Sequence, residues 1–155
     1  MTIKNICCIG AGYVGGPTMA VIAQKNPSIT VTVVDVNAQR IADWNDLDLT
    51  KLPIYEPGLE ELLQKEIASG RLTFTTDFNA IADVDVHFIC VGTPQQVGSL
   101  AADLKYVDAA LDAVAAICKP GALVVGKSTV PVGTAARLRD RLLKINPEAD
   151  LAWNP

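Results

Sequence analysis

The sequence predicts an α/β fold, a doubly wound parallel sheet with helices on both faces. Short apolar runs alternate along the chain with longer segments in which apolar residues recur at helical spacing, a pattern typical of repeated βα units. The chain has 155 residues, of which 50% are hydrophobic, and is therefore long enough to bury one substantial core. We expect a single domain over residues 1–155.

The first two βα units are expected at the N-terminus. Residues 3–9 (IKNICCI) form an apolar run typical of a buried strand, and the apolar side chains between Val14 and Ala23 predict the helix that follows. Residues 29–35 (ITVTVVD) are rich in β-branched side chains, which favour a strand, and this strand ends on an acid. A second helix is expected over residues 38–46.

Two prolines, Pro53 and Pro57, mark a break before the third helix. Apolar residues at helical spacing over 59–67 predict this helix, and Gly70 is expected to end it. Glu56 precedes the helix. We interpret it as a capping residue favoured by the helix dipole, with a role at the site as the alternative.

The middle of the chain predicts two further strands. The first covers residues 72–76 (LTFTT), and Asp77 is expected to be the N-cap of a helix of one or two turns after it. Residues 85–91 (DVHFICV) are typical of a central strand. His87, the only histidine, lies inside this strand, and we interpret it as a packed or edge-facing residue rather than a general base.

The C-terminal part continues the alternation. Asp103 is predicted to be the N-cap of a long helix with apolar residues at helical spacing, which the Lys-Pro-Gly sequence at 119–121 ends. A strand is expected over residues 122–126, a helix over 133–145 and the last strand over 150–153.

The composition excludes several classes of partner. The formal net charge is −4 and no basic run is present, so the chain lacks the positive charge that would neutralise the phosphates of a nucleic acid. No apolar stretch approaches the roughly 20 residues needed to span a bilayer, and the N-terminus does not resemble a signal peptide. We expect a soluble cytoplasmic protein with no nucleic-acid or membrane partner.

The four cysteines do not predict a metal site or a disulfide framework. Cys7 and Cys8 are neighbours in one apolar run, Cys90 lies in another, and Cys118 ends a helical pattern, so the spacing matches no zinc motif. We interpret all four as reduced, buried packing residues. A reactive thiol among them is the alternative.

A glycine-rich turn follows the first predicted strand. The sequence IGAGYVGG places Gly10, Gly12 and Gly15 at the spacing of a dinucleotide-binding turn between a strand and a helix. In such a turn the first glycine permits a sharp exit from the strand, the second lets the backbone approach a pyrophosphate, and the third lets the helix pack closely on the sheet. The N–H groups around Tyr13 and Val14 would meet the phosphates at the helix N-terminus.

Asp35 strengthens this interpretation because it lies 20 residues after Gly15, at the end of the second predicted strand. Its carboxylate is suited to accept hydrogen bonds from the ribose hydroxyls of an adenosine, and it would repel a 2′-phosphate. The residues therefore favour NAD over NADP as the cofactor of a Rossmann-type fold. Arg40 lies five residues later, and we interpret it as covering the adenine or its ribose, with a solvated surface charge as the alternative.

Two later loops also leave strand ends, where ligands bind in open α/β sheets. The first contains Gly92 and Thr93, which give a flexible backbone and a hydroxyl beside the expected cofactor crevice, followed by Pro94. The second is the sequence GKSTVPVGT, which contains Ser128 and Thr129. From the residues alone, each loop is equally well explained as a turn.

Six motifs together resemble the UDP-glucose/GDP-mannose dehydrogenase family, and within it most closely the members that act on UDP-glucose. In chain order they are GAGYVG, VVDVN, LPIYEPGL, VGTP, ADL and KSTVPVGT. The final Asn-Pro resembles the start of the family's NPEFL segment. The likeness covers essentially the whole chain, as the N-terminal part of the family's sequence.

The resemblance implies a two-step oxidation in which the primary alcohol of a nucleotide sugar becomes a carboxylate and two NAD are reduced. In the family a cysteine thiolate captures the intermediate aldehyde. The four cysteines of this chain do not match that cysteine motif, which lies well downstream together with the catalytic lysine and aspartate. The acids of the NPEFL segment are absent as well.

The resemblance also assigns roles to individual residues. It makes Gly10, Gly12, Gly15, Asp35 and Arg40 cofactor contacts. Thr93 borders the nicotinamide side in the family, and Ser128 belongs to the loop near the reaction centre. Thr129 resembles the threonine that hydrogen-bonds a water or a substrate oxygen where hydride leaves, with a purely structural role as the alternative. We interpret Lys127 as structural.

We interpret the chain as an NAD-binding domain that ends before the central helix and the domain that binds the UDP-sugar. It is expected to bind NAD without turnover, and the full-length protein is expected to be a homo-oligomer. One alternative is a non-catalytic module that senses NAD or a related nucleotide. Another is a dehydrogenase for GDP-mannose or an N-acetylated UDP-sugar.

Overall fold

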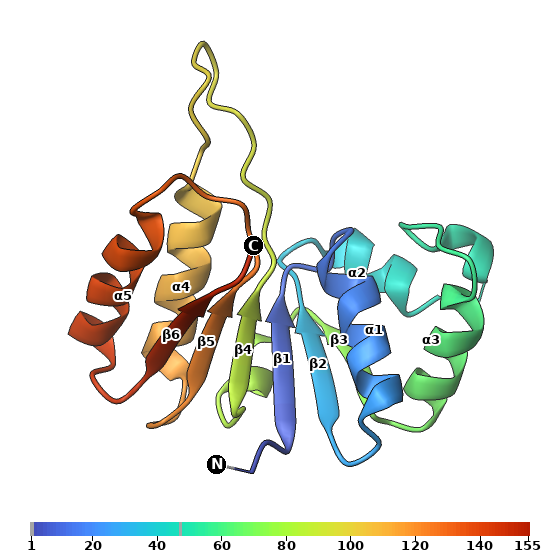
Figure 1. The fold of residues 1–155 in the computed structure, drawn as a ribbon. Helices are drawn as coiled ribbons and strands as arrows, with labels where there is room; N and C mark the ends of the chain where they lie inside the picture. The colour runs from blue at the N-terminus through green and yellow to red at the C-terminus, as the bar shows by residue number, and fades with distance from the viewer. Residues whose placement is uncertain (1, 47) are drawn as a thin grey trace.

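The fold is a three-layer α/β arrangement with one six-stranded parallel sheet in the middle (Figure 1). The structure is a computed structural model and describes residues 2–46 and 48–155. The order of the strands across the sheet is β3-β2-β1-β4-β5-β6, so β1 lies between β2 and β4. This is the strand order of a dinucleotide-binding α/β fold, and the predicted fold class is confirmed.

The strands and helices follow the predicted alternation. The strands are β1 (Asn5–Ile9), β2 (Thr30–Val34), β3 (Leu72–Thr75), β4 (Val86–Ile89), β5 (Leu123–Gly126) and β6 (Asp150–Trp153). The α-helices are α1 (Gly15–Lys25), α2 (Ala38–Trp44), α3 (Leu59–Ala68), α4 (Lys105–Ile117) and α5 (Thr134–Ile145). Two short 3₁₀ helices cover Leu49–Lys51 and Phe78–Ile81.

Two apolar cores hold the helices on opposite faces of the sheet. Side chains of β1 alternate between them: Cys8 packs with α1, α2 and α3 on one face, whereas Cys7 and Ile9 pack with α4 and α5 on the other. This alternation follows from the two-residue period of a strand that is covered on both sides. All neighbouring strands are parallel, so their carboxyl ends meet at one edge of the sheet.

Two predicted caps are displaced. Leu104 occupies the N-cap position of α4, and the Asp103 carboxylate accepts a hydrogen bond from the Lys105 N–H at 3.0 Å. Asp103 therefore satisfies an N-terminal donor from one residue earlier than predicted. Gly58, at φ 82°, is the N-cap of α3, and Glu56 contributes only its carbonyl oxygen, which accepts the Leu59 N–H at 3.0 Å. The predicted capping role of the Glu56 carboxylate is wrong.

The other caps and the edges of the strands agree more closely with expectation. Asp77 caps the short helix after β3, since its carboxylate accepts the Asn79 N–H at 2.9 Å. The central strand is shorter than the predicted 85–91, because pairing ends at Ile89.

Between β4 and α4 a long hairpin projects away from the sheet (Figure 1). It is closed by an antiparallel bridge between Gln95 and Ala102, which the sequence did not predict.

Candidate functional site

A cleft of about 620 Å³ opens at the carboxyl edge of the sheet, where β1 and β4 lie side by side. From β1 the chain continues to β2 and β3 on one side, and from β4 it continues to β5 and β6 on the other, so the connections diverge here. In open α/β sheets, ligands bind at this switch point. One wall is formed by the end of β2 and the start of α2, and the other by α4 and the segment after β4.

The three glycines of the turn after β1 are required for different reasons. At Gly10 the φ of 105° is in the left-handed region, and a Cβ would lie 2.7 Å from the Cys90 carbonyl oxygen. At Gly15 a Cβ would lie 1.9 Å from the Gly10 carbonyl oxygen. At Gly12 a Cβ would meet nothing within 4 Å, and this residue lines the cleft. The first and third glycines thus serve packing, whereas the second leaves the cleft open for a ligand.

The N-terminus of α1 lies directly after these glycines. The Gly16 N–H donates to the Gly12 carbonyl oxygen at 3.1 Å, so the helical hydrogen bonds begin at Gly12. The N–H groups of the residues between them therefore have no intrahelical acceptor. Tyr13 is 81% exposed and Val14 is 48% exposed, so neither is held in the core. Free donors and the helix dipole make this end of α1 suited to an anion.

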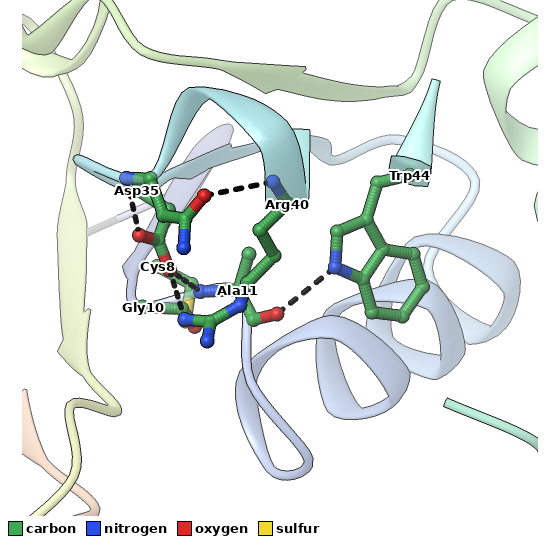
Figure 2. Close-up of polar contacts among 7 residues, drawn as sticks. Cys8, Gly10, Ala11, Asp35, Arg40 and Trp44 are labelled. Carbon is green, nitrogen blue, oxygen red and sulfur yellow. Dashed lines mark hydrogen bonds and ion pairs between the residues drawn. The ribbon is translucent and has the colours of Figure 1, made fainter. Parts of the chain in front are cut away.

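The Asp35 carboxylate is buried at the end of β2, beside the glycine turn. Its Oδ2 accepts hydrogen bonds from the Ala11 N–H at 2.8 Å and from Arg40 Nη1 at 3.2 Å, and its Oδ1 accepts the Asn37 N–H at 2.8 Å. Figure 2 shows Asp35, Ala11 and Arg40 converging on one another. A carboxylate offers about four acceptor sites, so one is left after these three bonds.

Trp44 packs beside the glycine turn (Figure 2). Its Nε1 donates to the Ala11 carbonyl oxygen at 2.9 Å, and its ring is stacked on Phe74 with centroids 4.8 Å apart. A Cβ at Gly16 would lie 2.2 Å from the same ring. Gly16 is thus a fourth required glycine, which the sequence analysis did not single out because its partner lies 28 residues away.

The structure places half of the predicted site residues in the cleft wall. Those that line the cleft are Gly10, Gly12, Asp35, Arg40, Gly92 and Pro94. Those that lie outside its wall are Tyr13, Val14, Gly15, Thr93, Ser128 and Thr129. Thr129 is exposed on the loop after β5, and Ser128 is buried in that loop.

The loop after β5 is held by side-chain hydrogen bonds. Ser128 Oγ donates to the Val91 carbonyl oxygen at 2.7 Å, and Thr93 Oγ1 donates to the Thr129 carbonyl oxygen at 3.0 Å. Lys127 Nζ donates to Asn154 Oδ1 at 2.9 Å, which agrees with its structural interpretation. The two predicted loops therefore contact each other.

One face of α4 forms a part of the cleft that the sequence analysis missed. Tyr106, Ala109, Ala110 and Ala113 line the wall, with Phe78 contributing from the short helix after β3. The four residues of α4 have the spacing of one helix face, and the small side chains of the three alanines leave room for a ligand. The spacing is visible in the sequence, but which face of α4 meets the cleft depends on the fold.

The four cysteines are free thiols, as expected. Cys7, Cys8 and Cys118 are buried, whereas Cys90 is partly exposed and lines the cleft, so its predicted burial is only partial. Burial raises the pKa of Cys7, and a hydrogen bond with the Cys8 thiol lowers the pKa of Cys90.

His87 is fully buried in β4, and the expectation of a packed residue is confirmed. Its Nδ1 lies 3.1 Å from the Cys7 Sγ, and burial lowers its pKa to about 4. The ring is therefore neutral at physiological pH and does not face the cleft wall.

The part of the chain that the structure describes contains neither a metal cluster nor a membrane-spanning helix. No group of three or more His, Cys, Asp or Glu side chains there is arranged to hold a metal ion. The helices of residues 2–46 and 48–155 are all too short or too polar to cross a bilayer.

Comparison with known proteins places this geometry in a family. The sequence profile of the UDP-glucose/GDP-mannose dehydrogenase family, NAD binding domain, matches residues 4–155. The chain belongs to this family. Its NAD-binding fold and the family predicted from the six motifs are thereby confirmed, and NAD is the cofactor of this domain.

The curated relatives are longer than this chain. The UDP-glucose 6-dehydrogenase of Drosophila melanogaster is 46% identical over 155 residues, which cover 97% of this chain and 32% of the fly protein. The enzyme of the same name from Gallus gallus is 48% identical over 162 residues, covering 99% and 32%. The chain thus spans about a third of the length of these relatives.

Solved structures of related dehydrogenases have the same fold as this chain. A ternary complex of GDP-mannose dehydrogenase from Pseudomonas aeruginosa matches 97% of this chain and 35% of its own, with a TM-score of 0.85 and 33% identity. A UDP-glucose dehydrogenase from Pyrobaculum islandicum matches 98% of this chain and 35% of its own, with a TM-score of 0.80 and 34% identity.

Proposed function

We propose that this chain is the NAD-binding domain of a UDP-glucose 6-dehydrogenase, followed in the full-length protein by a central helix and a domain that binds the UDP-sugar. The observation that carries the NAD site is the open Gly12 position beside the buried Asp35 carboxylate, both in one cleft. The curated relatives of that name support the substrate, since their identity to this chain is 46% and 48% over nearly its whole length.

The residues at the turn fit a dinucleotide. We assign the pyrophosphate to the N-terminus of α1, where the N–H groups of Tyr13 and Val14 offer donors that no helical carbonyl satisfies. Gly12 lets the backbone approach, while Gly10 and Gly15 keep β1 and α1 close enough to form the turn.

Asp35 is assigned to the adenosine ribose. Its remaining acceptor site is available to a hydroxyl, and its charge would repel a 2′-phosphate, so NAD is favoured over NADP. Arg40 is bound to this carboxylate, and its side chain remains 43% exposed. Movement of the guanidinium toward the adenine would free a second acceptor site on Asp35 Oδ2 for the ribose.

The nicotinamide half is assigned to the loops after β4 and β5. Bound NAD supplies a hydride acceptor. Gly92 and Pro94 line the cleft there, and Thr93 stands between them in the sequence. We assign Thr129 to the reaction centre, and its resemblance to the family's threonine supports this assignment. A hydroxyl suits that place because it donates and accepts hydrogen bonds without adding charge.

The proposed reaction converts the primary alcohol of UDP-glucose to the carboxylate. This is a four-electron oxidation, so each sugar requires two hydride acceptors. The second candidate is a related sugar nucleotide, because the GDP-mannose dehydrogenase structure has nearly the same identity to this chain as the UDP-glucose dehydrogenase structure, 33% against 34%.

The test uses the full-length protein. Purified enzyme is incubated with NAD and either UDP-glucose, GDP-mannose or UDP-N-acetylmannosamine, and the reduced cofactor is measured by its absorbance. The proposal expects reduction with UDP-glucose at two NADH per sugar. NADH formation with only one of the other two sugar nucleotides would mean that the protein acts on that sugar nucleotide, as the second candidate states. Binding of NAD without NADH formation from any of the three would favour the sensing module.

We further propose that the full-length protein is a homo-oligomer in the cytoplasm. Three apolar side chains are almost fully exposed on loops at the carboxyl edge of the sheet: Val97, Leu100 and Val132. Exposed apolar surface of this kind supports the proposal that another subunit or domain covers these loops in the full-length protein. Light scattering of the full-length protein tests this, and a monomer at all concentrations would contradict it.

A further inference from the structure

Both polar groups of the Ala11 backbone are held by side chains from other elements. The Ala11 N–H donates to Asp35 Oδ2 at 2.8 Å, and the Ala11 carbonyl oxygen accepts a hydrogen bond from Trp44 Nε1 at 2.9 Å (Figure 2). Ala11 is completely buried, so neither group has water as an alternative partner. The residue between the first two glycines of the turn is therefore fixed from two directions.

The position of the Trp44 indole is set by β3. Its ring is stacked on Phe74 with an interplanar angle of 3°, and the next residue, Asn45, donates through Nδ2 to the Phe74 carbonyl oxygen at 3.0 Å. Trp44 is buried, and α1 packs against the same ring at Gly16. A buried indole N–H requires an acceptor, and α2 places this donor at the turn after β1.

The bond from Trp44 fixes the peptide that joins Ala11 to Gly12. In a planar trans peptide the C=O and the N–H point in opposite directions, so the Gly12 N–H is directed away from the indole. Gly12 lines the cleft, and the helical hydrogen bonds of α1 begin at its carbonyl oxygen. The orientation of this one peptide therefore sets how the chain enters α1.

We propose that Trp44 is a positioning residue that holds the glycine turn in the conformation that accepts the diphosphate of the cofactor. Trp44 does not line the cleft, so it acts through Ala11 and not by contact with the ligand. The inference rests on the proposed assignment of the phosphates to the N-terminus of α1. A role in packing alone is the alternative, and it would change stability without changing affinity.

The first experiment removes the indole N–H. Trp44→Phe keeps an aromatic ring beside Phe74 and loses the donor to Ala11. Trp153→Phe is the matched control, because Trp153 Nε1 also donates to a backbone carbonyl oxygen, that of Ser128 at 3.1 Å, from the far edge of the sheet. Calorimetry measures the Kd for ADP, which has the adenosine and the diphosphate but no nicotinamide, and the Kd for adenosine. Amide exchange of residue 12 is measured without ligand.

A lost hydrogen bond of ordinary strength corresponds to about a fivefold change in an equilibrium constant. We expect Trp44→Phe to raise the Kd for ADP by about fivefold and to accelerate amide exchange at Gly12 in the empty chain. The Kd for adenosine should stay nearly unchanged, because adenosine has no diphosphate to bind at the turn. Trp153→Phe should leave all three quantities close to those of the unaltered chain.

The second experiment uses the unaltered chain, because Trp44→Phe also leaves a buried carbonyl oxygen without its donor, which lowers the stability of the fold. Binding and bond formation are linked, so a bond that tightens ADP binding is itself favoured by bound ADP to the same factor. At saturating ADP, exchange of the Trp44 indole N–H with solvent should therefore slow by about fivefold more than that of Trp153.

Three outcomes overturn the inference. An unchanged Kd for ADP in folded Trp44→Phe would leave Trp44 with a packing role only. Equal increases in the Kd for ADP and for adenosine would mean that the whole cleft is loosened. Equal slowing of the two indole N–H groups would mean that ADP stabilises the fold and not this bond. If the folded, unaltered chain binds neither NAD nor ADP, the proposed function fails separately, and unchanged exchange at Gly12 in Trp44→Phe would still reject the positioning role.

Discussion

The Asp35 carboxylate accepts a hydrogen bond from the Ala11 N–H at 2.8 Å and so joins the end of β2 to the glycine turn. The same carboxylate is the group assigned to the ribose of NAD. One buried carboxylate therefore holds the glycine turn in shape and, in the proposed function, selects the ligand, and the two roles predict separate effects of substitution.

Asp35→Ala is expected to destabilise the chain. It leaves the Ala11 and Asn37 N–H groups and the Arg40 guanidinium without their acceptor, and an unsatisfied buried donor costs about 1–3 kcal/mol. Urea unfolding should show a loss of about 2 kcal/mol in the free energy of unfolding. A loss no larger than that of the exposed control Asp140→Ala would contradict the structural role.

Gly12→Ala and Gly15→Ala are expected to have opposite consequences. A Cβ at Gly12 meets no protein atom within 4 Å, so Gly12→Ala should fold with nearly unchanged stability and bind NAD more weakly. A Cβ at Gly15 would overlap the Gly10 carbonyl oxygen, and a loss of more than about 3 kcal/mol is expected. Thermal unfolding and NAD titration of both variants distinguish the two, and equal stability of the pair would refute the assignment.

His87 predicts a loss of stability on mild acidification. Burial lowers its folded pKa to about 4, below the unfolded value of about 6.5, so the unfolded chain binds the proton more readily. Stability is therefore complete above about pH 6.5 and declines as the pH falls toward 4. Between about pH 7 and pH 5 the loss should be about 2 kcal/mol. In His87→Leu this decline should vanish, and an unchanged decline would assign it to other groups.

Asp85 predicts a second loss at lower pH. Its Oδ1 lies 2.7 Å from Lys119 Nζ and its Oδ2 accepts the Lys4 N–H at 2.7 Å. The hydrogen bond with Lys119 holds the pKa of Asp85 well below its usual range. Its contribution to stability is thus present above about pH 4 and is lost as the pH falls below that value. In Asp85→Asn the free energy of unfolding should depend less on pH below about pH 4 than in the unaltered chain. An equal pH dependence in the two proteins would exclude Asp85 as its source.

The sequence was sufficient for features that depend on near neighbours. The alternation of apolar patterns predicted every strand and α-helix, and Asp77 was identified as a cap because its acceptor function acts two residues away. Glu56 was misassigned because the αL conformation of Gly58 begins α3 without a side-chain cap.

Features that depend on strand order escaped prediction. The contact of Ser128 with Val91 exists because β5 lies beside β4, and that with Trp153 because β6 lies beside β5. Likewise, Tyr106 was not identified as a cleft residue, since only the packing of α4 on the sheet fixes which helix face meets the cleft. The glycine turn and Asp35 were found because their spacing in the sequence is itself the signal.

The central claim is most directly tested by calorimetric titration of this chain with NAD and NADP, repeated on Asp35→Asn, which removes the charge and keeps the shape of the side chain. The account predicts that NAD binds at least about tenfold more tightly than NADP, a difference of about 1.4 kcal/mol, and that this preference falls in the variant. A folded chain that binds neither cofactor, or that binds NADP more tightly than NAD, would contradict it.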